Sequence, residues 1–187
     1  ASFIRALGMN ANDDITNYNM AVVQLALDQP REALGYAQKA VQASESNAVY
    51  QYTLGLANEQ SANLDGAIAA YTRSAALDRR YIRPRVNLGG LYLANGFTDK
   101  ALEILLEAWA IDQDNFEVNN NLGSAYSRKE VWNKSVEHYE RALATDPSHQ
   151  VARFNLARAY VGSNRFERAR DVYIELVKLN ASNWDAL

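Results

Sequence analysis

A chain of 187 residues can bury a substantial core, and 19 basic against 22 acidic residues leave a net charge of −3 at pH 7. This balance argues against a general polyanion binder, so we expect no nucleic-acid partner. The absence of cysteine excludes disulfides, thiolate metal sites and a cysteine nucleophile.

In chain order, residues 1–13 are predicted to be the last turns of an upstream second helix, because Phe3-Ile4 through Asn10-Ala11 parallels Tyr173-Ile174 through Asn180-Ala181. Five helix–turn–helix repeats follow. Their expected ranges are 14–47, 48–81, 82–115, 116–149 and 150–183. Residues 184–187 are predicted to begin a further first helix, so we expect a segment of a longer array; the alternative is a complete protein with frayed ends.

The repeats share a large residue followed by a small one, at a constant spacing of 34 residues. These pairs are Met20-Ala21, Leu54-Gly55, Leu88-Gly89, Leu122-Gly123 and Leu156-Ala157. A second small residue lies twelve positions later, at Ala33, Ala67, Ala101, Ser135 and Ala169. Antiparallel helices approach to about 8–10 Å only where small residues face each other, so these positions predict the crossing points. Helices this short are not stable alone, and packing on neighbours must stabilise them.

Short polar residues stand where first helices are expected to begin: Asp13, Asn47, Asn115 and Asn183. Such side chains cap the free N–H groups of a helix start. Gly96 and Asn164 fall in the turns within repeats, and both residue types tolerate a left-handed backbone. The sequence therefore predicts where the helices begin and turn.

With these positions in place, the chain resembles the tetratricopeptide repeat family. The fourth repeat matches the family pattern best, through Leu122, Gly123, Tyr126, Ser135, Tyr139, Ala142 and Pro147. The resemblance implies an all-α fold: a right-handed α-solenoid superhelix of antiparallel helix pairs. The chain departs from the pattern at repeat position 4, normally large, which is polar throughout as Asn17, Gln51, Arg85, Asn119 and Arg153.

The resemblance also implies that first helices line a concave face, to which repeat positions 2, 5, 6, 9, 12 and 13 point. Position 6 is Asn19, Thr53, Asn87, Asn121 and Asn155. An amide both donates and accepts, so a row of them could hold the backbone of an extended peptide. This row is similar to the asparagine ladder of O-linked N-acetylglucosamine transferases. The alternative is that these amides bond within or between repeats.

The other groove positions change along the chain. The first two repeats offer an apolar and aromatic strip that contains Tyr18 and Tyr52, suited to hydrophobic side chains or an amphipathic helix. This strip could instead pack against an upstream repeat or a second copy. The fourth repeat is polar, with Glu117, Asn120, Ser124, Ser127 and Arg128. The predicted partner-binding residues are Tyr18, Asn19, Tyr52, Asn87, Asn120, Asn121, Asn155 and Arg158.

Several narrower functions are disfavoured. No window of three repeats carries the Lys, Asn and Arg pattern of family members that bind chaperone tails. The basic cluster Arg79, Arg80, Arg83 and Arg85 could meet an acidic partner or a phosphate, but such a run is more often a solvated turn. The strict 34-residue period also differs from the period of about 35 of the RNA-reading pentatricopeptide repeats.

No catalytic chemistry is predicted, and no metal or cofactor is expected. His138 and His149 have no partner at metal or triad spacing, and no phosphate loop or nucleophile elbow occurs. The leading hypothesis is a scaffold that binds a peptide or partner helix in its concave groove. The alternatives are the substrate-recruiting arm of a larger enzyme and self-association through exposed terminal repeats.

We expect a soluble chain, because no run approaches the roughly 18 apolar residues of a membrane span. The compartment stays open, since a chain without cysteine suits the cytoplasm and the periplasm equally.

Overall fold

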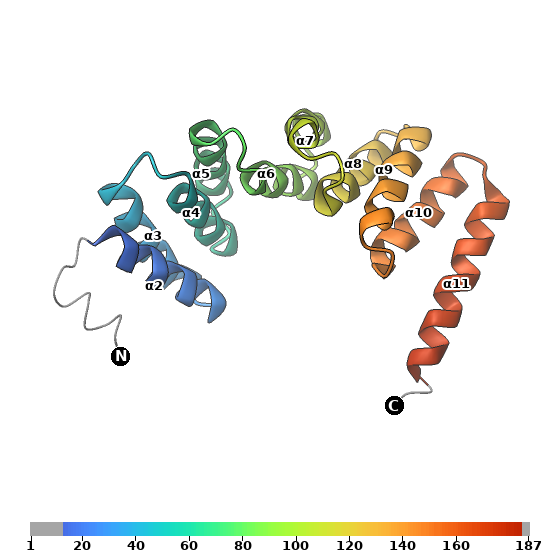
Figure 1. Ribbon diagram of the computed structural model, residues 1–187, viewed down its shortest axis with the longest axis horizontal. Helices are drawn as coiled ribbons and strands as arrows, with labels where there is room; N and C mark the ends of the chain where they lie inside the picture. Colours follow the sequence, from blue (N-terminus) through green and yellow to red (C-terminus); the bar gives the residue numbers. More distant parts are fainter. Residues whose placement is uncertain (1–12, 185–187) are drawn as a thin grey trace. The chain divides into compact units, whose positions relative to one another are not determined.

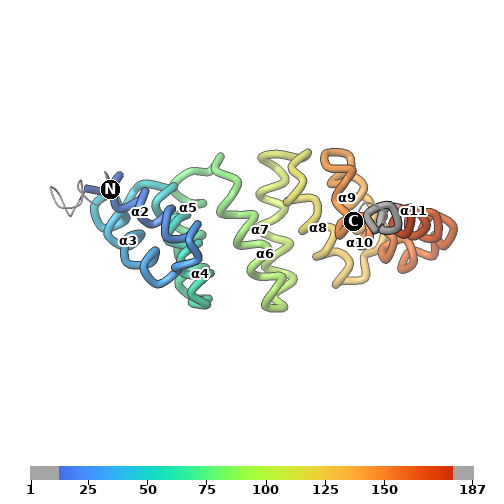
Figure 2. The backbone as a smooth tube through the Cα atoms, turned by 90° about the horizontal axis from the view of Figure 1, so that it is seen from below, coloured from blue at the N-terminus to red at the C-terminus, as the bar shows by residue number. Residues whose placement is uncertain are grey.

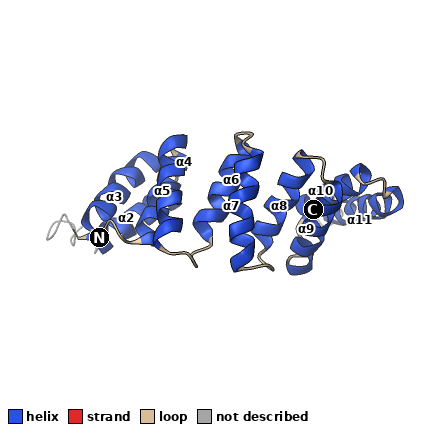
Figure 3. Ribbon diagram, turned by 90° about the horizontal axis from the view of Figure 1, so that it is seen from above, coloured by secondary structure: helices blue, strands red, loops and turns tan. Residues whose placement is uncertain are grey.

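The computed structural model describes residues 13–184, and every regular element in that range is an α-helix (Figures 1 and 3). The helices are α2 (Asp14–Ala26), α3 (Pro30–Ala43), α4 (Ala48–Gln60), α5 (Leu64–Leu77), α6 (Arg83–Ala94), α7 (Thr98–Ile111), α8 (Phe116–Arg128), α9 (Trp132–Thr145), α10 (Gln150–Gly162) and α11 (Phe166–Trp184). Short turns join them.

The chain forms two compact units that divide between Leu88 and Gly89, inside α6. In the first unit, α2 packs on α3, α3 on α4 and α4 on α5, and the first helices α2 and α4 also touch. In the second unit the same order runs from α7 to α11, with α8 touching α10 (Figure 2). Consecutive helices thus pack on one another from α2 to α5 and from α7 to α11, which confirms the predicted all-α solenoid of helix pairs.

Polar side chains start the first helices as predicted. Asp13 accepts a hydrogen bond from the N–H of Thr16 at 2.7 Å, and Asn115 accepts one from Val118 at 3.1 Å. Asn47 caps α4 in the same way. The prediction for Asn183 is wrong, because α11 continues to Trp184. Neither glycine nor proline interrupts the sequence of α11, so nothing in it forbids helical backbone.

The sequence predicts that a new first helix begins at Trp184, but in the structure Trp184 is the last residue of α11. The remaining residues of that expected element, 185–187, lie outside the described residues. The expected end of an upstream second helix, residues 1–13, also lies outside the described residues except for Asp13.

The turns within the repeats use a left-handed backbone, as expected for Gly96 and Asn164, whose φ angles are 79° and 61°. Three residues that the sequence did not single out, Asp28, Ala62 and Glu130, take the same conformation at 56–58°. The same turn therefore recurs along the chain whether or not the residue favours it.

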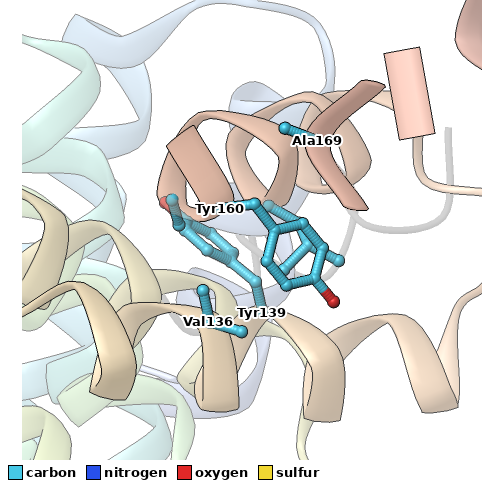
Figure 4. Packing of buried hydrophobic residues seen from close by; sticks show 6 residues of the cluster. Val136, Tyr139, Tyr160 and Ala169 are labelled. Atoms are coloured by element: carbon cyan, nitrogen blue, oxygen red, sulfur yellow. The ribbon is translucent and has the colours of Figure 1, made fainter. Parts of the chain in front are cut away.

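Close helix approach is clearest at Gly123 of α8. Its carbonyl accepts a hydrogen bond from the Ser135 hydroxyl of α9 at 2.9 Å, as the predicted crossing point requires. A Cβ atom on Gly123 would lie 2.8 Å from ring atoms of Tyr139. Glycine here makes room for a large aromatic ring as well as for a small residue. Figure 4 shows that ring with Val136, near Tyr160 and Ala169, in the buried core between α9, α10 and α11.

The polar residues at repeat position 4 fix the turns between repeats. In four repeats the side chain donates to the backbone carbonyl six residues earlier: Gln51 to Glu45, Arg85 to Arg79, Asn119 to Gln113 and Arg153 to Pro147. All except Arg153 are buried. A buried polar group needs a hydrogen-bond partner, and here the backbone of the turn supplies it, so the departure from the family pattern replaces apolar packing with bonds to the turn.

Asn119 also bonds the one histidine of this core. Its Oδ1 lies 3.0 Å from Nδ1 of His138, whose ring stacks on Tyr126 and meets Trp109 edge-on. Burial lowers the pKa of His138 from its ordinary 6.5, Glu137 opposes this, and Arg141 and Lys134 add to it. The histidine is therefore neutral within the folded core.

A pH-dependent stability follows from this burial. Below pH 6.5 the unfolded chain binds a proton at His138 that the folded chain binds only at lower pH. The free energy of unfolding should therefore fall as the pH drops from about 7.5 to about 5.5. Urea midpoints at these pH values measure it, and His138→Phe should show a shallower pH slope. An unchanged slope in the variant would assign the effect to other groups.

Candidate functional site

The second unit contains a groove with a cavity volume of about 580 Å³, within the range of ordinary ligand sites. Its walls come from the first helices α8 and α10 and from the second helices α9 and α11. The lining residues are Ser124, Ser127, Arg128, Trp132, Tyr139, Asn155, Arg158, Val161, Gly162 and Tyr173. These ten residues define the groove.

Packing and hydrogen bonds fix the floor of the groove. The Tyr139 hydroxyl donates to Ser124 Oγ at 3.1 Å, and the hydroxyls of Ser127 and Ser135 lie 2.7 Å apart. Tyr139 is almost fully buried, so only a small part of it faces the groove. The floor is thus a set of hydroxyl groups held by the helix crossing below it.

One wall depends on a glycine. A Cβ atom on Gly162 would lie 2.3 Å from a ring atom of Trp132, so the indole packs directly against the backbone of α10. Any larger residue at position 162 would displace this ring. Gly162 therefore lets Trp132, from the start of α9, form an aromatic wall beside Asn155 and Arg158.

The groove is electropositive. Arg128 and Arg158 line it. None of the ten described residues that line the groove is acidic. Burial raises the pKa of Tyr139, whereas hydrogen bonds with Ser124 and Ser127 and the charges of Arg158 and Arg128 lower it. Arg128 and Arg158 therefore bring two positive charges, from α8 and α10, to the same groove.

Two of the predicted partner-binding residues, Asn155 and Arg158, lie in the groove. The neighbouring predicted pair does not line it. Asn121 lies beside α6, with Nδ2 3.7 Å from where a Cβ on Gly90 would stand. Asn120 has a buried Oδ1 to which no described residue donates a hydrogen bond.

The two predicted tyrosines of the first unit each pack against other tyrosine rings. Tyr18 stacks on Tyr50 with ring centres 5.1 Å apart. Tyr52 packs against Tyr71 at 5.7 Å and Tyr81 at 5.3 Å. Burial raises the pKa of Tyr81 to about 12, with Tyr18 and Tyr52 among the contributing neighbours. Asn19, half-buried, lies on the same helix as Tyr18.

Asn87 is bound within the repeats. Its amide donates to the Tyr71 hydroxyl at 3.2 Å, and that hydroxyl donates to Glu59 at 2.5 Å. Burial and the bond to Glu59 raise the pKa of Tyr71. At this one position of the asparagine row, the amide bonds between repeats, which was the alternative to holding a peptide backbone.

The arginine cluster is divided by burial. Arg85 is buried and donates to the carbonyls of Arg79 and Ala75, so it holds the turn into α6. Arg79, Arg80 and Arg83 are exposed. His149, the other residue weighed for chemistry, caps α10 by accepting from the N–H of Ala152 at 3.1 Å.

Sequence reasoning missed three aromatic groove residues. Tyr139 and Tyr173 occupy the repeat position of core residues, and Trp132 opens a second helix, where no groove residue was expected. Ser124, Ser127 and Arg128 were recognised as groove positions but not selected as binding residues. The available signal was the pairing of Trp132 with a glycine 30 residues later, Gly162.

A second hollow, apolar in character, lies on α11 and the end of α10. It is lined by Val161, Phe166, Ala169, Arg170, Tyr173, Ile174, Val177 and Lys178. Phe166 and Val177 are strongly exposed there. The predicted self-association stays a prediction.

Among the described helices, none has the length and apolar character needed to cross a bilayer. Over the same residues, no three potential metal ligands of the His, Cys, Asp or Glu type gather at one place.

Several solved structures share the fold. MamA from Desulfovibrio magneticus RS-1 superposes with a TM-score of 0.81 at 20% identity, over 90% of this chain and 96% of its own. PilF of Pseudomonas aeruginosa gives 0.79 at 19% identity, over 90% and 78%. YrrB, described as a TPR protein with an unusual peptide-binding site, gives 0.77 at 18%, over 95% and 92%. At these identities the likeness concerns the fold alone.

No curated protein sequence is similar enough to count as a match. Family profiles described as Tetratricopeptide repeat do match, one over residues 60–123 and 132–187 and another over residues 18–82. These ranges cover most of the chain. The chain belongs to the tetratricopeptide repeat family.

Proposed function

We propose that this protein is an interaction scaffold that binds a peptide segment of a partner protein in the groove of its second unit. The observation that carries the proposal is the groove itself: a preformed hollow in which hydroxyl, amide, guanidinium and aromatic groups converge. Sites of this kind combine an apolar body with a few placed polar groups, as peptide and ligand sites do. The description of YrrB as peptide-binding supports the same class of role.

Each kind of lining residue suits part of a peptide. The Asn155 amide can donate to a backbone carbonyl and accept from a backbone N–H. Trp132 and Tyr173 offer flat apolar surface for one large side chain, and aromatic residues are frequent binding hot spots. Residues of the first unit that were predicted to bind, Tyr18, Asn19 and Tyr52, remain candidates for a separate contact.

We infer that the chain carries no catalysis of its own. His138 is neutral and enclosed by aromatic rings, and His149 is a helix cap. The hydroxyls of Ser124 and Ser127 bond Tyr139 and Ser135 rather than a general base. An assay of the whole protein for hydrolysis of generic ester and peptide substrates should give only background rates.

A selection of short peptides from a random display library tests the binding role. The wild-type protein should enrich a family of related peptides, and Asn155→Ala should weaken the best of them by about 2–12-fold, the worth of one net hydrogen bond. The matched control is Asn133→Ala, since Asn133 is exposed, contacts Arg165 and lies outside the groove. Failure to enrich any peptide, or equal loss in both variants, would refute the proposal.

A further inference from the structure

We propose that the groove selects acidic peptides: segments in which an aspartate or glutamate stands beside a large apolar residue. The inference rests on the proposed peptide-binding function and names the chemistry of the ligand. It is carried by the pairing pattern of the arginines in the second unit, which separates the two groove residues from the others.

The arginines outside the groove have partners. Four of them form ion pairs: Arg141 with Glu137 at 3.5 Å, Arg153 with Glu175 at 3.0 Å, Arg168 with Glu140 at 3.8 Å, and Arg170 with Asp171 at 2.8 Å. Arg165 donates to the side-chain oxygen of Asn133 at 2.9 Å. On the outer surface of this unit, positive charge is therefore largely matched by the chain itself.

The two groove arginines form no ion pair with any described residue. Arg128 donates through one guanidinium nitrogen to the backbone carbonyl of Leu93, which orients the group and leaves its charge unmatched. Arg158 is exposed on α10, one turn after Asn155. Both side chains line the same groove, so their charges are available to one ligand.

A carboxylate is the ligand group that fits this region. A guanidinium group presents several N–H donors in a planar fork that matches a carboxylate, and two such groups lining one groove favour an anion. The Ser124 and Ser127 hydroxyls lie on the same floor and can complete its hydrogen bonds. No acidic lining residue competes for the arginines.

The aromatic wall sets the neighbouring residue. Trp132, Tyr173 and Val161 line the same hollow as the two arginines. A peptide that places its carboxylate at Arg128 and Arg158 therefore sets the adjacent side chain against apolar surface. This arrangement differs from the chaperone-tail pattern, since the arginines stand at repeat positions 13 and 9 rather than at 2 and 6.

Arrays of short synthetic peptides test the preference. Three sets share a central Leu or Phe and differ in the flanking residues, which are Glu and Asp, Gln and Asn, or phosphoserine. The wild-type protein should bind the acidic set about tenfold more tightly than the amide set, the usual worth of a charge-assisted hydrogen bond. This preference should weaken as salt is raised, because exposed charges are screened.

Arg158→Gln carries the mutational test, because its side chain is exposed and supports no ion pair. It should reduce the preference for acidic over amide peptides about tenfold, and Arg128→Gln should act in the same direction. The control is Arg170→Gln, which removes the same charge from α11 but lies outside the groove and should leave binding unchanged. Circular dichroism of each variant confirms that it is folded.

The outcomes separate this inference from the proposed function. Binding of amide peptides as tightly as acidic ones, or an Arg158→Gln protein that keeps the full preference, overturns the acidic selectivity and leaves peptide binding standing. A stronger preference for phosphoserine than for carboxylate peptides also overturns it. Failure to bind any set refutes the proposed function itself.

Discussion

Replacing Leu122 by alanine should lower the free energy of unfolding of the second unit by about 2–5 kcal/mol, the usual cost of emptying a core leucine site. The Leu122 side chain is fully buried on α8, beside the glycine that admits the Tyr139 ring. In a stack of short helices, stability comes from such interfaces, because no helix is stable alone. Urea unfolding followed by circular dichroism measures the loss.

Leu106→Ala is the matched control for this experiment. Leu106 lies on α7 in the same unit but is 41% exposed, so the same truncation removes less buried contact. We expect a loss below about 1 kcal/mol there, as for most partly exposed sites. Equal losses for the two variants would contradict the assignment of Leu122 to the core.

Asn119→Ala should be nearly as severe, with an expected loss of roughly 2–4 kcal/mol, because it leaves buried groups without partners. Its amide nitrogen donates to the carbonyls of Gln113 at 2.7 Å and Asn115 at 2.9 Å, and its oxygen meets His138 at 3.0 Å. The change would therefore loosen the turn between α7 and α8. It would also remove the side-chain oxygen that meets Nδ1 of the buried His138.

Asn95→Ala tests whether the loss depends on burial. Asn95 is exposed near the end of α6 and donates to one backbone carbonyl, that of Leu91 at 2.8 Å. Solvent can replace this bond, so thermal unfolding of the variant should occur close to the wild-type temperature. No decrease for Asn119→Ala would show that this position-4 residue does not hold its turn. A large decrease for Asn95→Ala would show that the loss does not depend on burial.

Much of the fold follows from the sequence because its determinants are local and repeated. The large–small pairs place the helix crossings, and Asp13, Asn47 and Asn115 mark helix starts through bonds to the next few residues. Asn183 fails as such a marker because a cap requires a turn before it. The sequence of α11 contains no residue that enforces one, and the helix continues.

The candidate site is less predictable because it depends on contacts between repeats. Position rules placed Asn155 and Arg158 in the groove, yet the same rule chose Asn87, whose amide is bound to Tyr71. That bond exists because the second helix carries a tyrosine there, whereas the next repeat has Leu105. Likewise, Trp132 becomes a groove wall only through its packing on Gly162, thirty residues away.

The central claim, that a peptide segment binds in the groove of the second unit, is tested most directly by NMR of the whole protein during titration with the best peptide from the acidic set. The indole N–H of Trp132 and the guanidinium N–H groups of Arg128 and Arg158 should shift together with saturation. The signals of Trp109, which packs against His138, and of Arg170 should not move. Shifts confined to Trp109 or Arg170, with Trp132 and Arg158 unchanged at saturation, would contradict the account.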